Sequence, residues 1–371
     1  MFSLPYLLIL VIYLSIFIWE SKVANITLKK RSRLLCASLF IFFFGFRGLI
    51  GTDWYNYQYW YDEITINQWR VRDVELGFSF LGFLGKLFRL DYTYFQLMLV
   101  TIQVYLFDRF FSKFSPNISI AYIFLISLFP IVIIDLLRNF LAILIVMNGI
   151  IYLQQDNKKV FYLFVFGGML FHITSIVYFV LPFLNKKHFG KNQIILLFVV
   201  GLGVYFTRFD FYSGILNFIG NSLGGAFKSL TDQAASDGEA EYGINIGILE
   251  KMILFFLIIF NYKELKKIPP LIFNSCLIYL FIYFYFGTSQ SFINRFANLF
   301  MFGYILMYIN LILIIKRYKY YLAFISYLFT FIVARTFLSY NNIIYKYSNR
   351  IFVEDNQTER IDNRNYHYEK R

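Results

Sequence analysis

The sequence predicts an all-α polytopic integral membrane protein with about 10–12 membrane segments, some of them re-entrant. Of its 371 residues, 59% are hydrophobic and 22% are aromatic, whereas only 15% are charged. A soluble core could not bury so much apolar side chain. The hydrophobic residues also fall in blocks of roughly 17–23 residues, the length that a helix needs to cross about 30 Å of hydrocarbon. Together these observations exclude an ordinary soluble domain.

The expected membrane segments are separated by short polar stretches. The first block has no positive flank before it and no small-residue cleavage site after it, so we expect a membrane helix rather than a removable signal peptide. In order, the blocks cover residues 4–19, 34–50, 76–90, 94–111, 118–134, 137–153, 160–182, 193–209, 245–262, 269–286, 292–315 and 320–339.

The charges of the loops predict the orientation of these segments. Loop 20–33 carries several Lys and Arg residues against the single Glu20, whereas loop 51–75 is mainly acidic. Because short cytoplasmic loops are enriched in Lys and Arg, we expect the first loop to be cytoplasmic and the second to be external. The net charge of +13 then reflects this bias and does not indicate a nucleic-acid partner.

Two apolar blocks are expected not to cross the membrane. Block 160–182 lies between two basic stretches, and a single crossing cannot leave both of them in the cytoplasm. Gly167 and Gly168, followed by His172, offer a break at which this block could turn back. Block 76–90 is interrupted by glycines and would be a partial external helix.

Residues 1–340 are expected to form a single multi-span membrane domain, with external loops near 51–75 and 210–244. The polar C-terminal tail, 341–371, is predicted from its composition to be external and poorly ordered. Both cysteines lie in apolar blocks and are expected to act as small hydrophobic residues, without a disulfide or a metal site. The sequence lacks the internal repeat that is typical of secondary transporters.

Ionisable residues within or beside membrane segments are costly, so each is a candidate site residue. Arg47 and Asp53 lie at the external end of a predicted segment, in a stretch rich in Gly and aromatic residues, where they could meet. The alternatives are that Arg47 snorkels to the interface and that the aromatic residues form a membrane belt.

Arg138 lies where two apolar blocks meet at the expected outer face. A planar guanidinium binds phosphate oxygens in a bidentate manner, so convergent arginines at this face would suit a lipid diphosphate. They would also stabilise a departing pyrophosphate without a metal ion. The alternative is an Asp135–Arg138 pair that merely satisfies both charges.

His172 and Arg295 are further candidates with structural alternatives. His172 lies in an apolar run, where it would serve equally well as a hydrogen-bonded core residue. Arg295 lies at the external start of a late segment, where it could be an interface anchor. The sequence has no nucleotide-phosphate loop, paired-cysteine motif or Ser-His-Asp pattern, so no cofactor is expected.

The order of these motifs resembles the EpsG family of bacterial exopolysaccharide membrane proteins, which is related in role to Wzy-type O-antigen and capsule polymerases. The resemblance rests on the Phe-Arg-x-x-x-Gly-Thr-Asp-x-x-x-Tyr run at 46–57, the Glu-x-Gly-Phe run at 75–78, Arg138, Phe171-His172 and Arg295. Two departures, Leu76 for a frequent Pro and Asn139 for a frequent Gln, remove no charge.

The resemblance implies a polymerase that transfers a growing glycan from its undecaprenyl-diphosphate carrier to the non-reducing end of an incoming lipid-linked repeat. Such a protein would be a multi-pass component of the bacterial inner membrane, working among membrane lipids at the periplasmic face. Its product would be O-antigen, capsule or exopolysaccharide, and its protein partners would be a flippase and a chain-length regulator.

The resemblance also implies roles for individual residues. Asp53 or Glu75 would accept the proton of the acceptor hydroxyl as general base, and His172 would orient one of these groups. The residues expected to bind diphosphate or glycan are Arg47, Tyr57, Arg138 and Arg295.

Two other classes of function stay open. A polysaccharide flippase or another transporter would share the membrane segments and the arginines, but should show two similar halves and a site at the midplane. Another glycan-modifying transferase, such as an acyltransferase, would usually need a catalytic His with a nearby acidic partner. His172 has none within its own helix turn.

Overall fold

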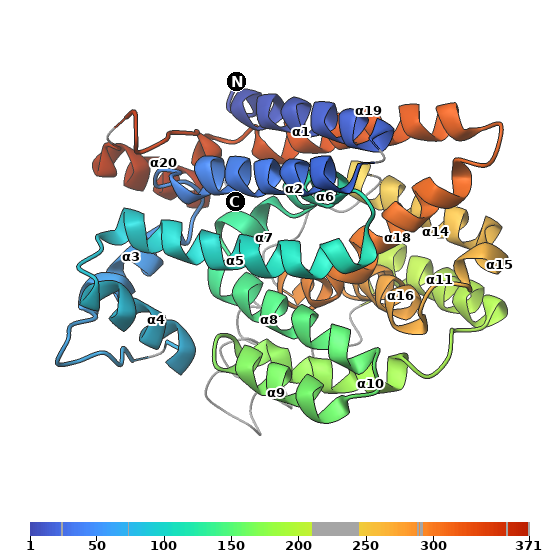
Figure 1. Ribbon diagram of the computed structural model, residues 1–371, viewed down its shortest axis with the longest axis horizontal. Helices are drawn as coiled ribbons and strands as arrows, with labels where there is room; N and C mark the ends of the chain where they lie inside the picture. The colour runs from blue at the N-terminus through green and yellow to red at the C-terminus, as the bar shows by residue number, and fades with distance from the viewer. Residues whose placement is uncertain are drawn as a thin grey trace. The chain divides into compact units, whose positions relative to one another are not determined.

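The computed structural model describes residues 1–23, 25–72, 74–209, 245–287, 289, 292–353 and 355–369. Regular structure in these ranges is helical (Figure 1), and one isolated antiparallel bridge joins Arg47 to Asn349. The prediction of an all-α membrane protein is therefore confirmed. The predicted external loop 210–244 lies outside the described residues.

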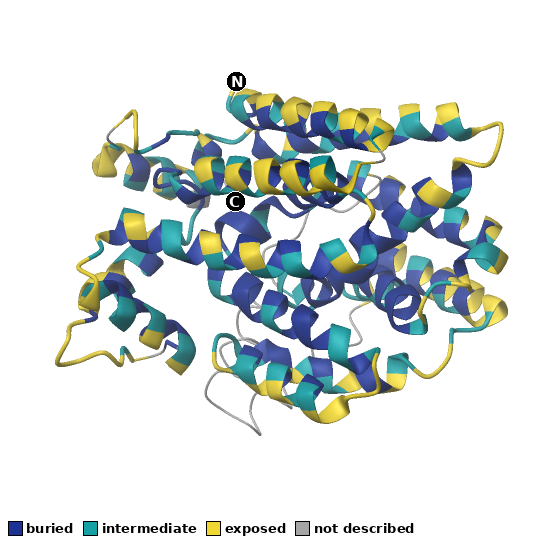
Figure 2. Ribbon diagram, in the orientation of Figure 1, coloured by how far each residue is buried: buried dark blue, intermediate teal, exposed yellow. Residues whose placement is uncertain are grey.

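The chain divides into two compact units, of which the first contains Met1–Phe179 and Ala323–Arg371. In this unit α8 is buried on nearly every side, whereas α1 and α2 each expose one face (Figure 2). Its elements are α1 (Leu4–Lys22), α2 (Ile26–Phe40), the π-helix η1 (Ile41–Gly45), α3 (Trp54–Glu63), α4 (Leu76–Leu87), α5 (Tyr92–Phe114), α6 (Ile118–Leu128), α7 (Pro130–Ile134), α8 (Leu137–Leu153), α9 (Lys158–Met169), the 3-10 helix η2 (Ile173–Val180), α19 (Tyr321–Tyr340), η5 (Ile343–Tyr345) and α20 (Gln357–Glu369).

The second unit, Val180–Leu322, is built around the contact between α16 and α18. A Cβ atom at Gly303 would lie 2.6 Å from the Cβ of Ser275, so the glycine lets the two helices approach closely. Its elements are α10 (Leu181–Leu184), α11 (Lys191–Thr207), α14 (Ile246–Phe260), α15 (Tyr262–Leu265), α16 (Pro270–Tyr285), η3 (Ile293–Ala297), η4 (Asn298–Phe300) and α18 (Met301–Ile315).

Three helices in the described part of the chain are long and apolar enough to cross a membrane, at Leu4–Lys22, Ile293–Ile315 and Tyr321–Tyr340. Others are shorter because the chain breaks them. Predicted segment 118–134, for example, divides at Pro130, which has no N–H to continue the helix. The chain thus combines full-length apolar helices with shorter apolar helices.

The predicted break in block 160–182 is confirmed. Helix α9 ends at Met169, and after a turn the chain returns as η2, where Phe179 stacks on Tyr162 with 5.4 Å between ring centroids. Twelve helical residues in α9 extend about 18 Å, short of a hydrocarbon core of about 30 Å. The geometry agrees with a helix that dips and returns, although its depth in the membrane stays a prediction.

The prediction of a poorly ordered C-terminal tail is wrong for the described residues 341–353 and 355–369, which we call the C-terminal segment. It contains η5, the bridge to Arg47 and the helix α20. Its Tyr347 ring stacks on Phe43 of η1 with 4.2 Å between centroids. Polar composition does not prevent order here, because the segment packs on the first unit.

Candidate functional site

The loop between η1 and α3, residues 46–53, is held by the C-terminal segment. Main-chain hydrogen bonds run from Arg350 N to Phe46 O at 2.9 Å, from Gly48 N to Ser348 O at 3.0 Å and from Gly51 N to Ile344 O at 2.8 Å. These bonds satisfy the polar backbone of an irregular stretch that carries two predicted site residues.

Arg47 is buried in this loop, with only 2% of its surface exposed. Its guanidinium donates to the carbonyl oxygens of Phe44 at 2.7 Å and Ile134 at 3.1 Å. Its Nε is buried without a hydrogen-bond partner among the described residues. The expected meeting of Arg47 and Asp53 is not among its contacts, because the guanidinium is turned toward main-chain oxygens.

Asp135, between α7 and α8, organises the end of the same loop. Its Oδ1 accepts hydrogen bonds from Thr52 N at 2.6 Å and Asp53 N at 3.0 Å. Gly51 has φ +88°, and a Cβ atom there would lie 2.3 Å from Asp135 Oδ1. Glycine is needed at this position for both reasons. Asp53 itself occupies the N-cap position of α3.

Arg138 pairs with Glu75, and the alternative Asp135–Arg138 pair is therefore wrong. Arg138 Nη1 contacts Glu75 Oε2, and the two side chains are 18% and 22% exposed. The guanidinium lies over the Trp60 ring, 4.4 Å from its centroid. Its Nε is buried without a hydrogen-bond partner in the described ranges. Arg138 thus keeps hydrogen-bonding capacity beside a carboxylate.

Tyr57 faces the same guanidinium from α3, with 5.9 Å between Arg138 Cζ and the Tyr57 ring centroid. Burial raises the pKa of the Tyr57 hydroxyl above its usual value, and the Arg138 charge only partly opposes this. Tyr57 is therefore a neutral hydrogen-bond donor at pH 7.

His172 reaches the same region through the turn between α9 and η2. Its Nδ1 lies 2.7 Å from Thr174 Oγ1, which in turn donates to Asn139 Oδ1 at 3.4 Å. The turn is tied to the start of α4, where Gly77 N donates to Leu170 O at 2.7 Å. His172 is thereby linked to the residue that follows Arg138.

The structure therefore brings together three of the predicted site residues, Tyr57, Glu75 and Arg138, which we call the Arg138 cluster. His172 is connected to this cluster through Thr174 and Asn139. Arg295 lies in η3 of the second unit. Sequence reasoning did not single out Trp60, although it follows Tyr57 by three residues and so shares its helix face.

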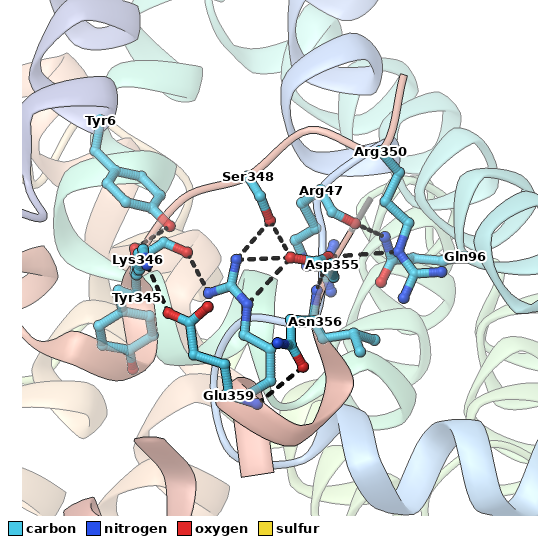
Figure 3. A network of polar contacts seen from close by, with 12 residues as sticks. Tyr6, Arg47, Gln96, Tyr345, Lys346, Ser348, Arg350, Asp355, Asn356 and Glu359 are labelled. Carbon is cyan, nitrogen blue, oxygen red and sulfur yellow. Dashed lines mark hydrogen bonds and ion pairs between the residues drawn. The ribbon is translucent and has the colours of Figure 1, made fainter. Parts of the chain in front are cut away.

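A second polar network, also not predicted, is centred on Asp355 of the C-terminal segment (Figure 3). Its carboxylate accepts hydrogen bonds from Ser348 Oγ at 2.6 Å, Leu49 N at 2.9 Å and Arg360 Nη2 at 2.7 Å. Burial alone would raise the pKa of Asp355, but the Ser348 hydrogen bond and the Arg360 charge hold it below its usual value. A Cβ atom at Gly48 would lie 2.0 Å from Asp355 Oδ2. The network fixes the start of loop 46–53.

A family model matches most of the chain. The model of the EpsG family matches residues 30–349, a range that contains every predicted site residue and part of the C-terminal segment. Searches of the curated proteins and of the solved structures find no match to the chain. Since the matched range is most of the chain, the protein belongs to the EpsG family of polysaccharide-related membrane proteins.

Proposed function

We propose that this protein polymerises undecaprenyl-diphosphate-linked oligosaccharide repeats into a surface polysaccharide at the periplasmic face of the inner membrane. The observation that supports this most directly is the Arg138–Glu75 pair. It is mostly buried, backed by the Trp60 ring, faced by Tyr57, and connected through Asn139 and Thr174 to His172. A guanidinium with unused donors next to a carboxylate provides both an anion ligand and a base.

The reaction needs two kinds of assistance. The bond between the donor sugar and its diphosphate must break, and the acceptor hydroxyl must lose its proton as the new glycosidic bond forms. The unpartnered Nε of Arg138 would bind a diphosphate oxygen and stabilise its growing charge. As Arg138 turns to the diphosphate, Glu75 would be released to accept the proton.

The other predicted residues take supporting roles in this proposal. Asp53 stays a second candidate for the base, and Arg295 a further ligand for the diphosphate. Arg47 was expected to bind diphosphate, but its hydrogen bonds to Phe44 O and Ile134 O favour a positioning role. His172 would orient the start of α8 through Thr174 and Asn139.

The test is to replace the pair by neutral or non-planar groups. Arg138→Lys keeps the charge but loses the planar fork, and Glu75→Gln keeps the shape but loses the base. Both variants should accumulate single lipid-linked repeats and lose long polymer, because losing a general base typically costs about 100- to 10,000-fold in rate. The exposed Arg70 supplies the matched control Arg70→Lys, which should leave polymer length unchanged.

Purified protein in detergent separates this proposal from transport. A polymerase supplied with lipid-linked repeats should form polymer without any sealed compartment, whereas a transporter has no chemical product to form. Long polymer from the Arg138→Lys and Glu75→Gln variants at matched protein level would refute the proposed roles.

A further inference from the structure

A cavity of about 720 Å³ lies in the first unit, apart from the residues of the Arg138 cluster. Its volume is within the range of small-molecule sites in proteins, about 300–1,000 Å³. Its walls come from loop 46–53, α3, the start of α5 and the C-terminal segment. The polar lining residues are Gln58, Asp91, Thr93, Arg350, Asp355 and Gln357.

The polar wall of this cavity is preorganised. Arg350 Nη1 donates to Thr93 Oγ1 at 2.6 Å, and Arg350 Nε lies 3.5 Å from Asp355 Oδ2 (Figure 3 shows Arg350 and Asp355). Asp91 Oδ1 accepts from Tyr94 N at 2.9 Å and so fixes the first turn of α5. Groups held in this way lose little conformational entropy when a ligand binds.

One lining residue, Gln58, has a hydrogen-bond acceptor that no described residue uses. Gln58 Oε1 is buried and has no hydrogen-bond partner within the described residues. A buried polar atom without a partner costs free energy, so a rotation of the Gln58 amide that turns Oε1 into the cavity would let a ligand hydroxyl satisfy it. Gln58 follows Tyr57 directly on α3, and Tyr57 faces Arg138. One short helix therefore serves both the cavity and the Arg138 cluster.

The charges of the cavity do not suit an anion. Its one arginine, Arg350, is paired with Asp355, and Asp91 adds a second carboxylate. Amide, hydroxyl and carboxylate groups instead match the hydroxyls of a neutral sugar. At the rim, the Tyr94 ring is 53% exposed and offers a flat surface for the apolar face of a sugar ring.

We infer that this cavity is a saccharide subsite, which holds sugar rings of the lipid-linked repeat while the diphosphate lies at the Arg138 cluster. The inference rests on the proposed function and extends it, since it assigns recognition of the glycan to a wall formed partly by the C-terminal segment. It makes Gln58, Tyr94 and Gln357 determinants of glycan affinity.

The experiment measures binding of two probes to the purified full-length protein in detergent. One is the oligosaccharide repeat released by mild acid from the host's own lipid-linked pool, without lipid or phosphate. The other is inorganic pyrophosphate. Gln58→Leu should weaken oligosaccharide binding about 2- to 10-fold, the effect of one hydrogen bond. Tyr94→Ala should weaken it by a similar factor, and neither variant should change pyrophosphate binding.

Two control variants match these changes outside the cavity. Gln68→Leu removes an exposed amide, and Tyr59→Ala removes a tyrosine that is 56% exposed. Both should bind the oligosaccharide like the wild type. Comparable melting temperatures across the set establish that each variant is folded.

The outcomes separate the subsite from the polymerase. Three results would overturn the subsite. The wild type could fail to bind the oligosaccharide, both Gln58→Leu and Tyr94→Ala could bind it with wild-type affinity, or these variants could lose pyrophosphate affinity to the same extent. Oligosaccharide binding that depends on Gln58 and Tyr94, in a protein that forms no polymer from lipid-linked repeats, would support the subsite and refute the polymerase. Polymer formation by the wild type, together with unaltered oligosaccharide affinity in both variants, would support the polymerase and refute the subsite.

Discussion

Asp355→Ala is expected to release the C-terminal segment from loop 46–53. The side chains of Asp355 and Arg360 are only 3% and 7% exposed, so water screens their attraction little. Removing one member of a buried ion pair typically costs about 3–5 kcal/mol. Arg360 would keep hydrogen bonds to Lys346 O and Ser348 Oγ, both at 2.6 Å, which favours the lower end of that range.

A cost of about 3 kcal/mol corresponds to roughly a hundredfold increase in the opening equilibrium of the segment. Hydrogen–deuterium exchange of peptides from α20, followed by mass spectrometry, reports this equilibrium directly. The double variant Asp355→Ala with Arg360→Ala should cost less than the sum of the single changes, because it leaves no buried charge unpaired.

Glu359→Ala is the matched control on the same helix. Glu359 pairs with Lys346, but both side chains are about half exposed, at 47% and 48%, so its removal should barely change exchange. Equal exchange in the wild type and Asp355→Ala, or equal acceleration by Asp355→Ala and Glu359→Ala, would refute the reasoning.

Three further predictions follow from the loop, the hairpin and the Asp355 network. Gly51→Ala should reduce the melting temperature and polymer length together, because φ is +88° and the added Cβ meets Asp135 Oδ1; a variant with wild-type stability would contradict this. Single cysteines at Lys158 and Lys187 should label from the same side of the membrane, and labelling from opposite sides would refute the re-entrant hairpin. The pKa of Asp355 in the folded state lies below its ordinary value of about 3.9. Its contribution to the stability of the C-terminal segment is therefore complete above that value. The contribution is lost as pH falls through the folded pKa, so the opening equilibrium of α20, obtained by dividing out the intrinsic pH dependence of amide exchange, should be constant near neutral pH and should rise only in strong acid.

Asp53→Asn provides a separate test of the loop predicted from the sequence. Asparagine matches Asp53 in shape and keeps an oxygen that can accept from Thr52 Oγ1, so this variant should stay abundant in the membrane. If Asp53 is the base, cells should lose long polymer and accumulate single repeats. Normal polymer would assign the base to another residue, and Trp54→Phe serves as the control with a mild expected effect.

The helices were predictable from the sequence because apolar blocks dominate it. Segment 137–153 matches α8 residue for residue, and the glycines that predicted a break in block 160–182 lie where α9 ends. At Gly168 the reason is contact, since a Cβ atom there would lie 2.7 Å from Val146 Cγ2. Loop 20–33 was predicted too long, because α2 already begins at Ile26.

The pairing of the site residues could not be predicted in the same way. The residue type and position of Arg138 pointed to it, and the family resemblance pointed to Glu75, but 63 positions separate the two in the sequence. Local spacing favoured Arg47 with Asp53 and Asp135 with Arg138. Arg47 instead donates to main-chain oxygens of Phe44 and Ile134, and Arg138 pairs with the distant Glu75. Leu49 and Asp355 are 306 positions apart, and the polar composition around Asp355 resembles that of a disordered tail.

The separation of Leu49 and Asp355 along the sequence also has a consequence for biosynthesis. At about 5–20 residues per second, the ribosome needs roughly 15–60 s to make the 306 positions that separate them. During that time the early helices must enter the membrane with loop 46–53 lacking its main-chain partners. The loop is therefore expected to reach its final form only after the C-terminal segment has left the ribosome. A nascent chain stalled before Ile343 should already be inserted, but Gly48 and Gly51 should still lack their main-chain partners Ser348 and Ile344.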